Sequence, residues 1–193
     1  MPTKLRFTVV AGKDLGEKLT ATDAEARLAI ARTVRAAQLD LQNAMKRNIK
    51  KTFHQHTGDF RRSIAIEPIT VSGPNITGPV GTNLEFAEIQ EEGGEIHAKR
   101  ARNLTIPLEA FLTGKGSAKG SAHDVIAAPG NYGYDGTFFS KGVLFGKKGD
   151  QVDPLFALKP SVTLPARPYA QPALDEVGPV FEQRLESALE ALL

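Results

Sequence analysis

The feature that most constrains this chain is one long stripe of apolar residues at helical spacing. The stripe consists of Ala26, Ile30, Val34, Ala37, Leu41, Ala44, Met45 and Ile49. Steps of three or four residues place these side chains on one face of an α-helix, and Thr22 with Glu25 matches a capping box at its start. The pattern predicts a helix of roughly 30 residues, or about 45 Å, that ends near Thr52. Because the core of one small domain rarely needs such a helix, we expect it to meet a neighbouring subunit.

The remaining segments predict a mixture of strands and shorter helices. Residues 4–10 are typical of a strand, and 63–71 with 76–83 predict a hairpin. Residues 84–92 predict a short helix that ends at the Gly93-Gly94 pair. The proline-interrupted segment 155–168 favours an edge strand. A C-terminal helix follows from Leu174, and its Gly178-Pro179 pair either kinks it or marks its start.

The middle of the chain differs from both ends. Nine of the 18 glycines lie between Gly114 and Gly149, without a sustained hydrophobic period. We therefore expect one α+β domain over 1–193, in which the long helix packs on a small, mostly antiparallel sheet, and residues 97–153 form a loop-rich insertion. The aromatic residues of this loop would order on meeting a neighbour. They are Tyr132, Tyr134, Phe138 and Phe139.

Charge is divided unevenly along the chain. The 193 residues carry 24 basic and 22 acidic side chains, but residues 1–70 hold 13 basic and 7 acidic ones. The densest basic stretch runs from Lys46 to Arg62, and the densest acidic one from Glu85 to Glu95. Such a division suits subunits that meet unlike face to unlike face, and the basic stretch could also approach phosphates.

Several kinds of catalytic site are excluded or disfavoured by the residues present. The absence of cysteine excludes disulfides and thiolate metal sites. The histidines at 54, 56 and 97 lack a His-Glu-x-x-His spacing, and GKGSAKGS from Gly114 lacks the first glycine of a phosphate loop. There is no Gly-x-Ser-x-Gly motif. We expect a protein that is not an enzyme, with no cofactor and no metal, and a metal-dependent hydrolase is the last alternative.

No apolar run approaches the roughly 20 residues of a membrane span. The N-terminal segment is too short and too soon charged for a secretory signal. We therefore expect an intracellular protein with no membrane partner.

Three segments of the chain together resemble a known family. They are TGDFRRSI (57–64), VGTNLEFAEIQEEGG (80–94) and LPARPYAQPALDE (164–176). In their order and spacing they resemble the tail-component and virion-morphogenesis proteins of tailed bacteriophages, which include neck and tail-completion subunits. The matching positions are Gly58, Arg62, Ser63 and Ile64; Gly81, Thr82, Asn83, Phe86, Ala87, Glu91 and Gly93; and Pro165, Ala166, Arg167, Pro168 and Tyr169.

The resemblance implies a structural virion protein, a head–tail joining subunit. It would be assembled in the bacterial host cytoplasm and form a homo-oligomeric ring around the DNA channel at the head–tail interface. Its partners would be copies of itself, neighbouring connector, head-closure or tail proteins, and packaged DNA. A minor tail or tail-terminator subunit is the close alternative, and a nucleic-acid-binding module is an alternative of a different class.

Eight residues are candidates for a subunit interface or for the DNA channel. They are Lys46, Lys50, Arg61, Arg62, Glu88, Glu91, Arg167 and Tyr169. We hypothesise that the basic residues meet an acidic face carried by Glu88 and Glu91 of the next copy, or else line the channel. Arg167, between two prolines, either contacts a partner ring or pins its own segment to a carboxylate or a carbonyl.

Overall fold

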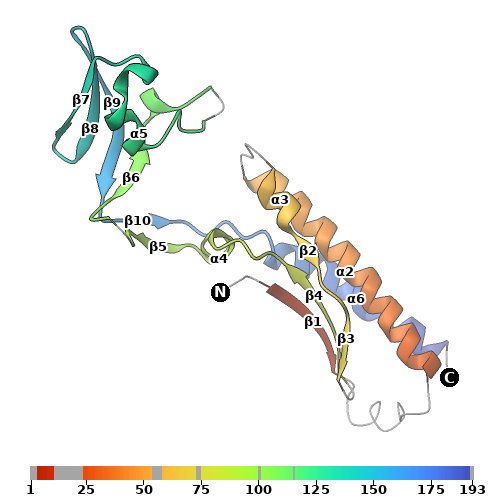
Figure 1. The fold of residues 1–193 in the computed structure, drawn as a ribbon. Coiled ribbons are helices and arrows are strands. Elements are labelled where there is room, and N and C mark those ends of the chain that lie inside the picture. Colours follow the sequence, from red (N-terminus) through yellow and green to blue (C-terminus); the bar gives the residue numbers. More distant parts are fainter. Residues whose placement is uncertain are drawn as a thin grey trace. The chain divides into compact units, whose positions relative to one another are not determined.

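The computed structural model describes residues 4–10, 24–53, 58–72, 75–99, 101–114 and 116–191 (Figure 1). The fold is α+β, as the sequence predicts. The chain divides into two compact units, and each is described separately: unit 1 comprises residues 1–93 and 165–193, and unit 2 comprises residues 94–164. The predicted insertion lies entirely within unit 2.

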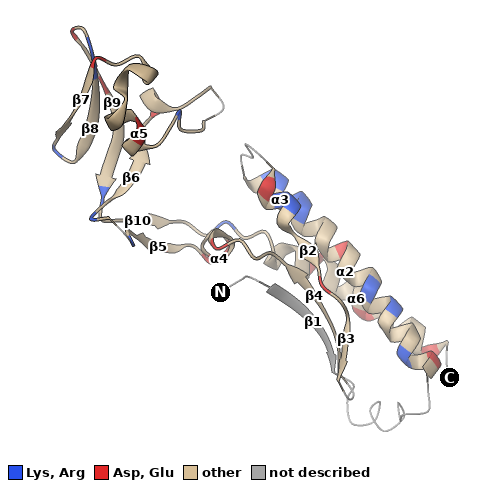
Figure 2. Cartoon of the chain, in the orientation of Figure 1, with Lys and Arg blue, Asp and Glu red and all other residues tan. Residues whose placement is uncertain are grey.

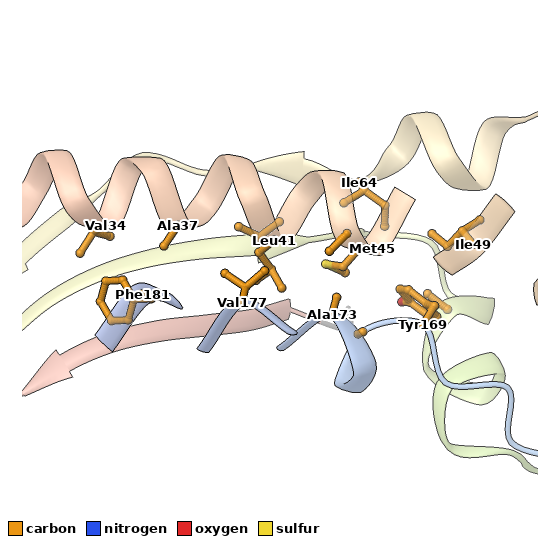
Figure 3. Close-up of a cluster of buried hydrophobic side chains, with 14 of the residues drawn as sticks. Val34, Ala37, Leu41, Met45, Ile49, Ile64, Tyr169, Ala173, Val177 and Phe181 are labelled. Atoms are coloured by element: carbon orange, nitrogen blue, oxygen red, sulfur yellow. The ribbon is translucent and has the colours of Figure 1, made fainter. Parts of the chain in front are cut away.

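Two long helices form the body of unit 1. Helix α2 (Ala24–Thr52) buries all eight residues of the predicted stripe, which confirms that prediction. Helix α6 (Gln171–Glu190) packs along it and contributes Ala173, Val177 and Phe181 to the same core (Figure 3). The stripe of α2 is therefore covered by the chain itself. Thr22 of the predicted capping box lies outside the described residues.

Exposed ion pairs show that α2 and α6 run antiparallel. Arg47 binds Glu176 and Asp40 binds Arg184, each with an N···O distance of 2.5 Å. Helix α6 begins at Gln171, so the interpretation that Gly178-Pro179 marks its start is wrong; Pro179 lies inside the helix.

An antiparallel sheet packs against α2 in unit 1. Its central strand is β4 (Asn75–Gly81), which pairs with β1 (Lys4–Val10) and, as the predicted hairpin, with β2 (Ala65–Ile66) and β3 (Thr70–Ser72). The side-chain amide of Gln38, buried in α2, donates to the carbonyl oxygens of Glu67 (2.9 Å) and Pro79 (3.1 Å). One of these carbonyl groups, that of Glu67, lies in the gap between β2 and β3, and the other, that of Pro79, lies in β4. By bonding to both, the Gln38 amide holds the sheet to the helix.

Two short helices complete unit 1. Helix α3 (Asp59–Ser63) follows Gly58, which has a positive φ of 72°. Helix α4 (Phe86–Glu92) ends at Gly93, also with a positive φ, 71°, as the glycine pair predicts.

Unit 2 has its own sheet and its own core. Its chain enters and leaves through paired strands β5 (Gly94–His97) and β10 (Ser161–Leu164). The sheet has the order β6-β9-β8-β7, all antiparallel. Its strands are β6 (Leu104–Pro107), β7 (Gly136–Ser140), β8 (Val143–Lys148) and β9 (Gln151–Lys159). Helix α5 (Ala122–Ala127) and the 3-10 turns η1 (Glu109–Phe111) and η2 (Pro129–Tyr132) accompany it.

The segment between Gly114 and Gly149, expected to be a glycine-rich loop, thus contains α5, η2, β7 and β8. The core of unit 2 consists of Phe111, Ala122, Val125, Tyr134, Leu144, Leu155 and Phe156. Tyr132 packs on Phe111, with ring centroids 5.4 Å apart, while Phe138 and Phe139 are exposed. Of the four aromatics predicted to meet a neighbour, Tyr134 thus belongs to the core and Tyr132 packs against it.

The expectation of an edge strand in 155–168 is confirmed for β10, one of the two strands of its sheet, and wrong for 155–159, which belong to β9. Strand β9 lies between β6 and β8. It tolerates Pro154 because a bulge leaves Leu155 unpaired beside it, and because β6 pairs with β9 only from Phe156 onward.

Candidate functional site

The surface of unit 1 carries an open hollow lined with cations, here called the basic hollow. It has a volume of about 570 Å³. Its lining residues are Asn43, Lys46, Arg47, Lys50, Arg61 and Arg62. Figure 2 shows basic residues on α3 and on the neighbouring end of α2. The structure thus brings together four of the five basic candidates, those at 46, 50, 61 and 62, which lie up to 16 residues apart in the sequence.

The helix period and an aromatic cluster position these side chains. Asn43, Arg47 and Lys50 follow steps of four and three along α2, which places them on one face. Helix α3 is held against the end of α2 by edge-to-face ring contacts of Phe60. Its ring centroid lies 5.4 Å from that of Phe53 and 5.0 Å from that of Tyr169. These contacts bring the two arginines of α3 to the cations of α2.

The charges of the hollow are only partly balanced. Arg47 pairs with Glu176, and Arg62 pairs with Asp59 on its own helix. Lys46, Lys50 and Arg61 have no carboxylate partner among the residues that the structure describes. Within the described part of the chain, the hollow therefore presents three positive charges without a carboxylate partner, together with the amide of Asn43.

The three family-like segments meet in one place, here called the motif junction. Ser63 Oγ donates to the carbonyl of Phe60 (2.7 Å) and lies 2.7 Å from Thr82 Oγ1, which links the first segment to the second. The Phe60 ring packs on Phe86 of the second segment, with centroids 5.2 Å apart, as well as on Tyr169 of the third. Residues more than 100 positions apart thus share one packed junction beside the basic hollow.

Glu91 connects the second and third segments of this junction. Its carboxylate accepts hydrogen bonds from three consecutive backbone N–H groups, those of Tyr169 (2.7 Å), Ala170 (2.9 Å) and Gln171 (2.9 Å). Free N–H groups and the helix dipole make the start of α6 favourable for an anion. Glu91 is therefore the cap of α6, supplied from α4, and this role within the chain accounts for its carboxylate without a contact to the next copy.

The other candidates have different environments. Glu88 is exposed in the first turn of α4. Tyr169 has an exposed fraction of 0% and is a core residue, so it is not an interface residue in this structure. Arg167 is exposed, and its backbone N–H donates to the Gln90 carbonyl oxygen at 2.8 Å; this bond does not involve the guanidinium for which a pinning role was predicted.

The candidate metal and phosphate-loop residues are not brought together. His54 and His56 lie outside the described residues, and His97 is exposed, with Nε2 3.4 Å from a carboxylate oxygen of Glu95. Within the described ranges, no three His, Asp or Glu side chains are grouped so that they could hold a metal ion. In the glycine-lysine segment, Lys119 Nζ donates to the Ala110 carbonyl at 3.1 Å.

Sequence reasoning missed three residues that shape this region. Arg47 and Asn43 line the hollow, and Gln38 is fully buried. The signal was present: Asn43 and Arg47 continue one helical face with Lys50, and Gln38 falls one turn after Val34 on the apolar stripe.

Comparison of the chain with protein-family models, with curated proteins and with solved structures found no match. In the part of the chain that the structure describes, no helix is long and apolar enough to cross a membrane.

Proposed function

We propose that this chain is a structural virion protein of a tailed bacteriophage, a neck or tail-completion subunit that forms a homo-oligomeric ring at the head–tail interface. In this proposal it surrounds the DNA channel, catalyses no reaction and contacts connector, head-closure or tail proteins along the ring axis.

The observation that carries the proposal is the motif junction. The three segments on which the family resemblance rests are separated in sequence, yet Ser63, Thr82, Glu91 and Tyr169 connect them through hydrogen bonds and ring packing. Their contacts support the interpretation that they form one structural unit with a shared role in shaping unit 1.

A ring requires that one face of the subunit complement a different face of the next copy. The predicted contact between the basic residues and an acidic face now depends on Glu88, because Glu91 caps α6 within the chain. Charge reversal at Arg61 and Glu88, singly and together, tests that contact. Restored assembly in the double variant supports it, and failure to restore assembly contradicts it.

The experiment that tests the proposed function is mass measurement by multi-angle light scattering across a concentration and salt series. We expect a discrete species of several subunits that becomes dominant as the protein concentration rises. A single-subunit mass at every concentration and salt would contradict the ring.

A further inference from the structure

We propose that the basic hollow binds the phosphodiester backbone of double-stranded DNA, without regard to base sequence. The inference deepens the proposed function and rests on it for the choice of DNA as the polyanion. The site itself is defined by the side chains of α2 and α3.

The chemistry of the lining points to an anion. Of the six lining side chains that the structure describes, five are lysine or arginine, which only donate hydrogen bonds, and the sixth, Asn43, offers an amide that can also donate. Guanidinium groups match the oxygen geometry of phosphate, and lysine adds mobile positive charge.

Folding brings these positive charges close together, so they repel one another, and a bound anion would relieve this repulsion. Lys46 and Lys50 are four residues apart on one helix face, where like charges repel by roughly 0.2–0.5 kcal/mol per pair. The dipole of α2 favours Lys50 and Lys51 in its last turn. The helix dipole does not explain why Lys46, more than a turn earlier in α2, is a cation, nor why Arg61 of the separate helix α3 lies beside it.

The dimensions favour a polymer backbone over a single small anion. A volume of about 570 Å³ is many times the roughly 30 Å³ that one water occupies in the liquid, and the hollow is open and extends over two helices. An acidic protein face is the other occupant considered above, but the carboxylate of Glu91, one of its two predicted carriers, caps α6 within the chain. Backbone phosphates supply regularly spaced charges to such a surface, and the contact is independent of sequence.

The test is fluorescence anisotropy of two labelled DNA duplexes of unrelated sequence, titrated with the full chain over a salt series. With three uncompensated cations, we expect log K against log salt to have a slope of roughly −3 for both duplexes. Arg61→Ala is expected to reduce the slope by about 1 and to weaken binding roughly five- to tenfold at 0.1 M salt. Arg61→Lys keeps the charge and is expected to retain most of the affinity.

Lys51→Ala is the matched control, because Lys51 is exposed in the same turn of α2 as Lys50 but does not line the hollow. This variant should change the affinity for DNA by less than about twofold. Circular dichroism checks that each variant is folded. Equal losses in Lys51→Ala and Arg61→Ala would overturn the site in favour of diffuse surface charge. Assembly lost in Arg61→Ala with DNA affinity unchanged would overturn it in favour of a protein-facing surface.

The failure of each proposal is separately visible. DNA binding that depends on Arg61 in a chain that stays monomeric by light scattering supports the hollow and contradicts the ring. A ring that forms but shows no salt-dependent DNA binding supports the proposed function and overturns this inference.

Discussion

Units 1 and 2 each build a core around a sheet, but they connect their segments in different ways. Unit 1 joins segments that are distant in sequence through polar contacts, such as Glu91 with the start of α6, 78 or more residues away. Unit 2 joins its segments through strand pairing, locally in β7 with β8 and β8 with β9, and over a longer range in β6 with β9 and β5 with β10. Among the described residues, both buried polar side chains, Gln38 and Thr82, belong to unit 1.

The difference indicates which unit depends on specific residue pairs for its structure. Buried amides and a shared carboxylate require defined partners, so unit 1 fixes one arrangement of its three family-like segments. Unit 2 depends on the apolar packing of its described core residues against its sheet. Unit 1 is therefore the part in which single changes should disturb distant segments, and the predictions below test this contrast.

The largest effect is expected for Tyr169→Ala. This fully buried ring packs on Phe53 and Phe60, so its removal should lower the free energy of unfolding of unit 1 by about 3–5 kcal/mol. Hydrogen exchange read by mass spectrometry should show lost protection in α2 and α6 and retained protection in β7–β9. Phe111→Ala, which truncates a ring in the core of unit 2, is the reciprocal variant. Equal loss of protection in both units from either variant would break the contrast.

Glycine-to-alanine substitutions should destabilise one unit at a time, with smaller losses of stability than the removal of a core ring. An added Cβ at Gly78 would lie 2.6 Å from Val34 Cγ1, and one at Gly146 would lie 2.7 Å from Tyr134 Cδ1. Each alanine variant should cost about 1–3 kcal/mol by overpacking, Gly78→Ala in unit 1 and Gly146→Ala in unit 2. Gly130→Ala, with open space around it, should stay within about 0.5 kcal/mol in urea unfolding. A neutral result at Gly78 would contradict the close packing of β4 on α2.

Glu91→Gln sharpens the comparison by removing one charge. The variant keeps an acceptor oxygen but loses the charge-assisted bonds at the start of α6, so unit 1 should lose about 1 kcal/mol. The matched control is Glu92→Gln at the exposed neighbouring position, which should be silent. If Glu91→Gln left stability unchanged but abolished assembly, Glu91 would be an interface residue as the sequence had suggested.

The smallest expected effect is a dependence of the stability of unit 2 on pH. The Ser121 hydroxyl and backbone N–H donate to Asp124 and hold the pKa of its carboxyl below the ordinary value of 3.8. Because the folded pKa is lowered, the stabilisation is present above about pH 3.8 and is lost as the pH falls through the folded value. Asp124→Asn should flatten this acid limb in hydrogen exchange of α5 between about pH 2 and 5. An unchanged limb would contradict the capping box of α5.

The sequence predicted unit 1 better than unit 2 for physical reasons. The stripe of α2 repeats over two dozen residues, long enough for the helical period to be unambiguous, and a glycine pair marks the end of α4. In unit 2 the bulge at Leu155 buries it together with Phe156, which breaks the alternation that identifies a strand. Gly146, buried against Tyr134, looks like a loop residue in sequence.

The candidate site was predictable in part. The cations of α2 and α3 stand out in the sequence, but their convergence depends on the contacts of Phe60 with Phe53 and Tyr169, which composition does not reveal. The cap formed by Glu91 joins residues 78 positions apart, and no local pattern predicts such a bond.

Electron microscopy of the assembled species tests the central proposal, a ring-forming virion subunit, most directly. We expect particles of uniform diameter whose averaged end views show rotational symmetry around an open centre. Because a heterologous contact that does not close produces filaments, open helical polymers would contradict the account, as would a field of single subunits at the concentration where scattering is maximal.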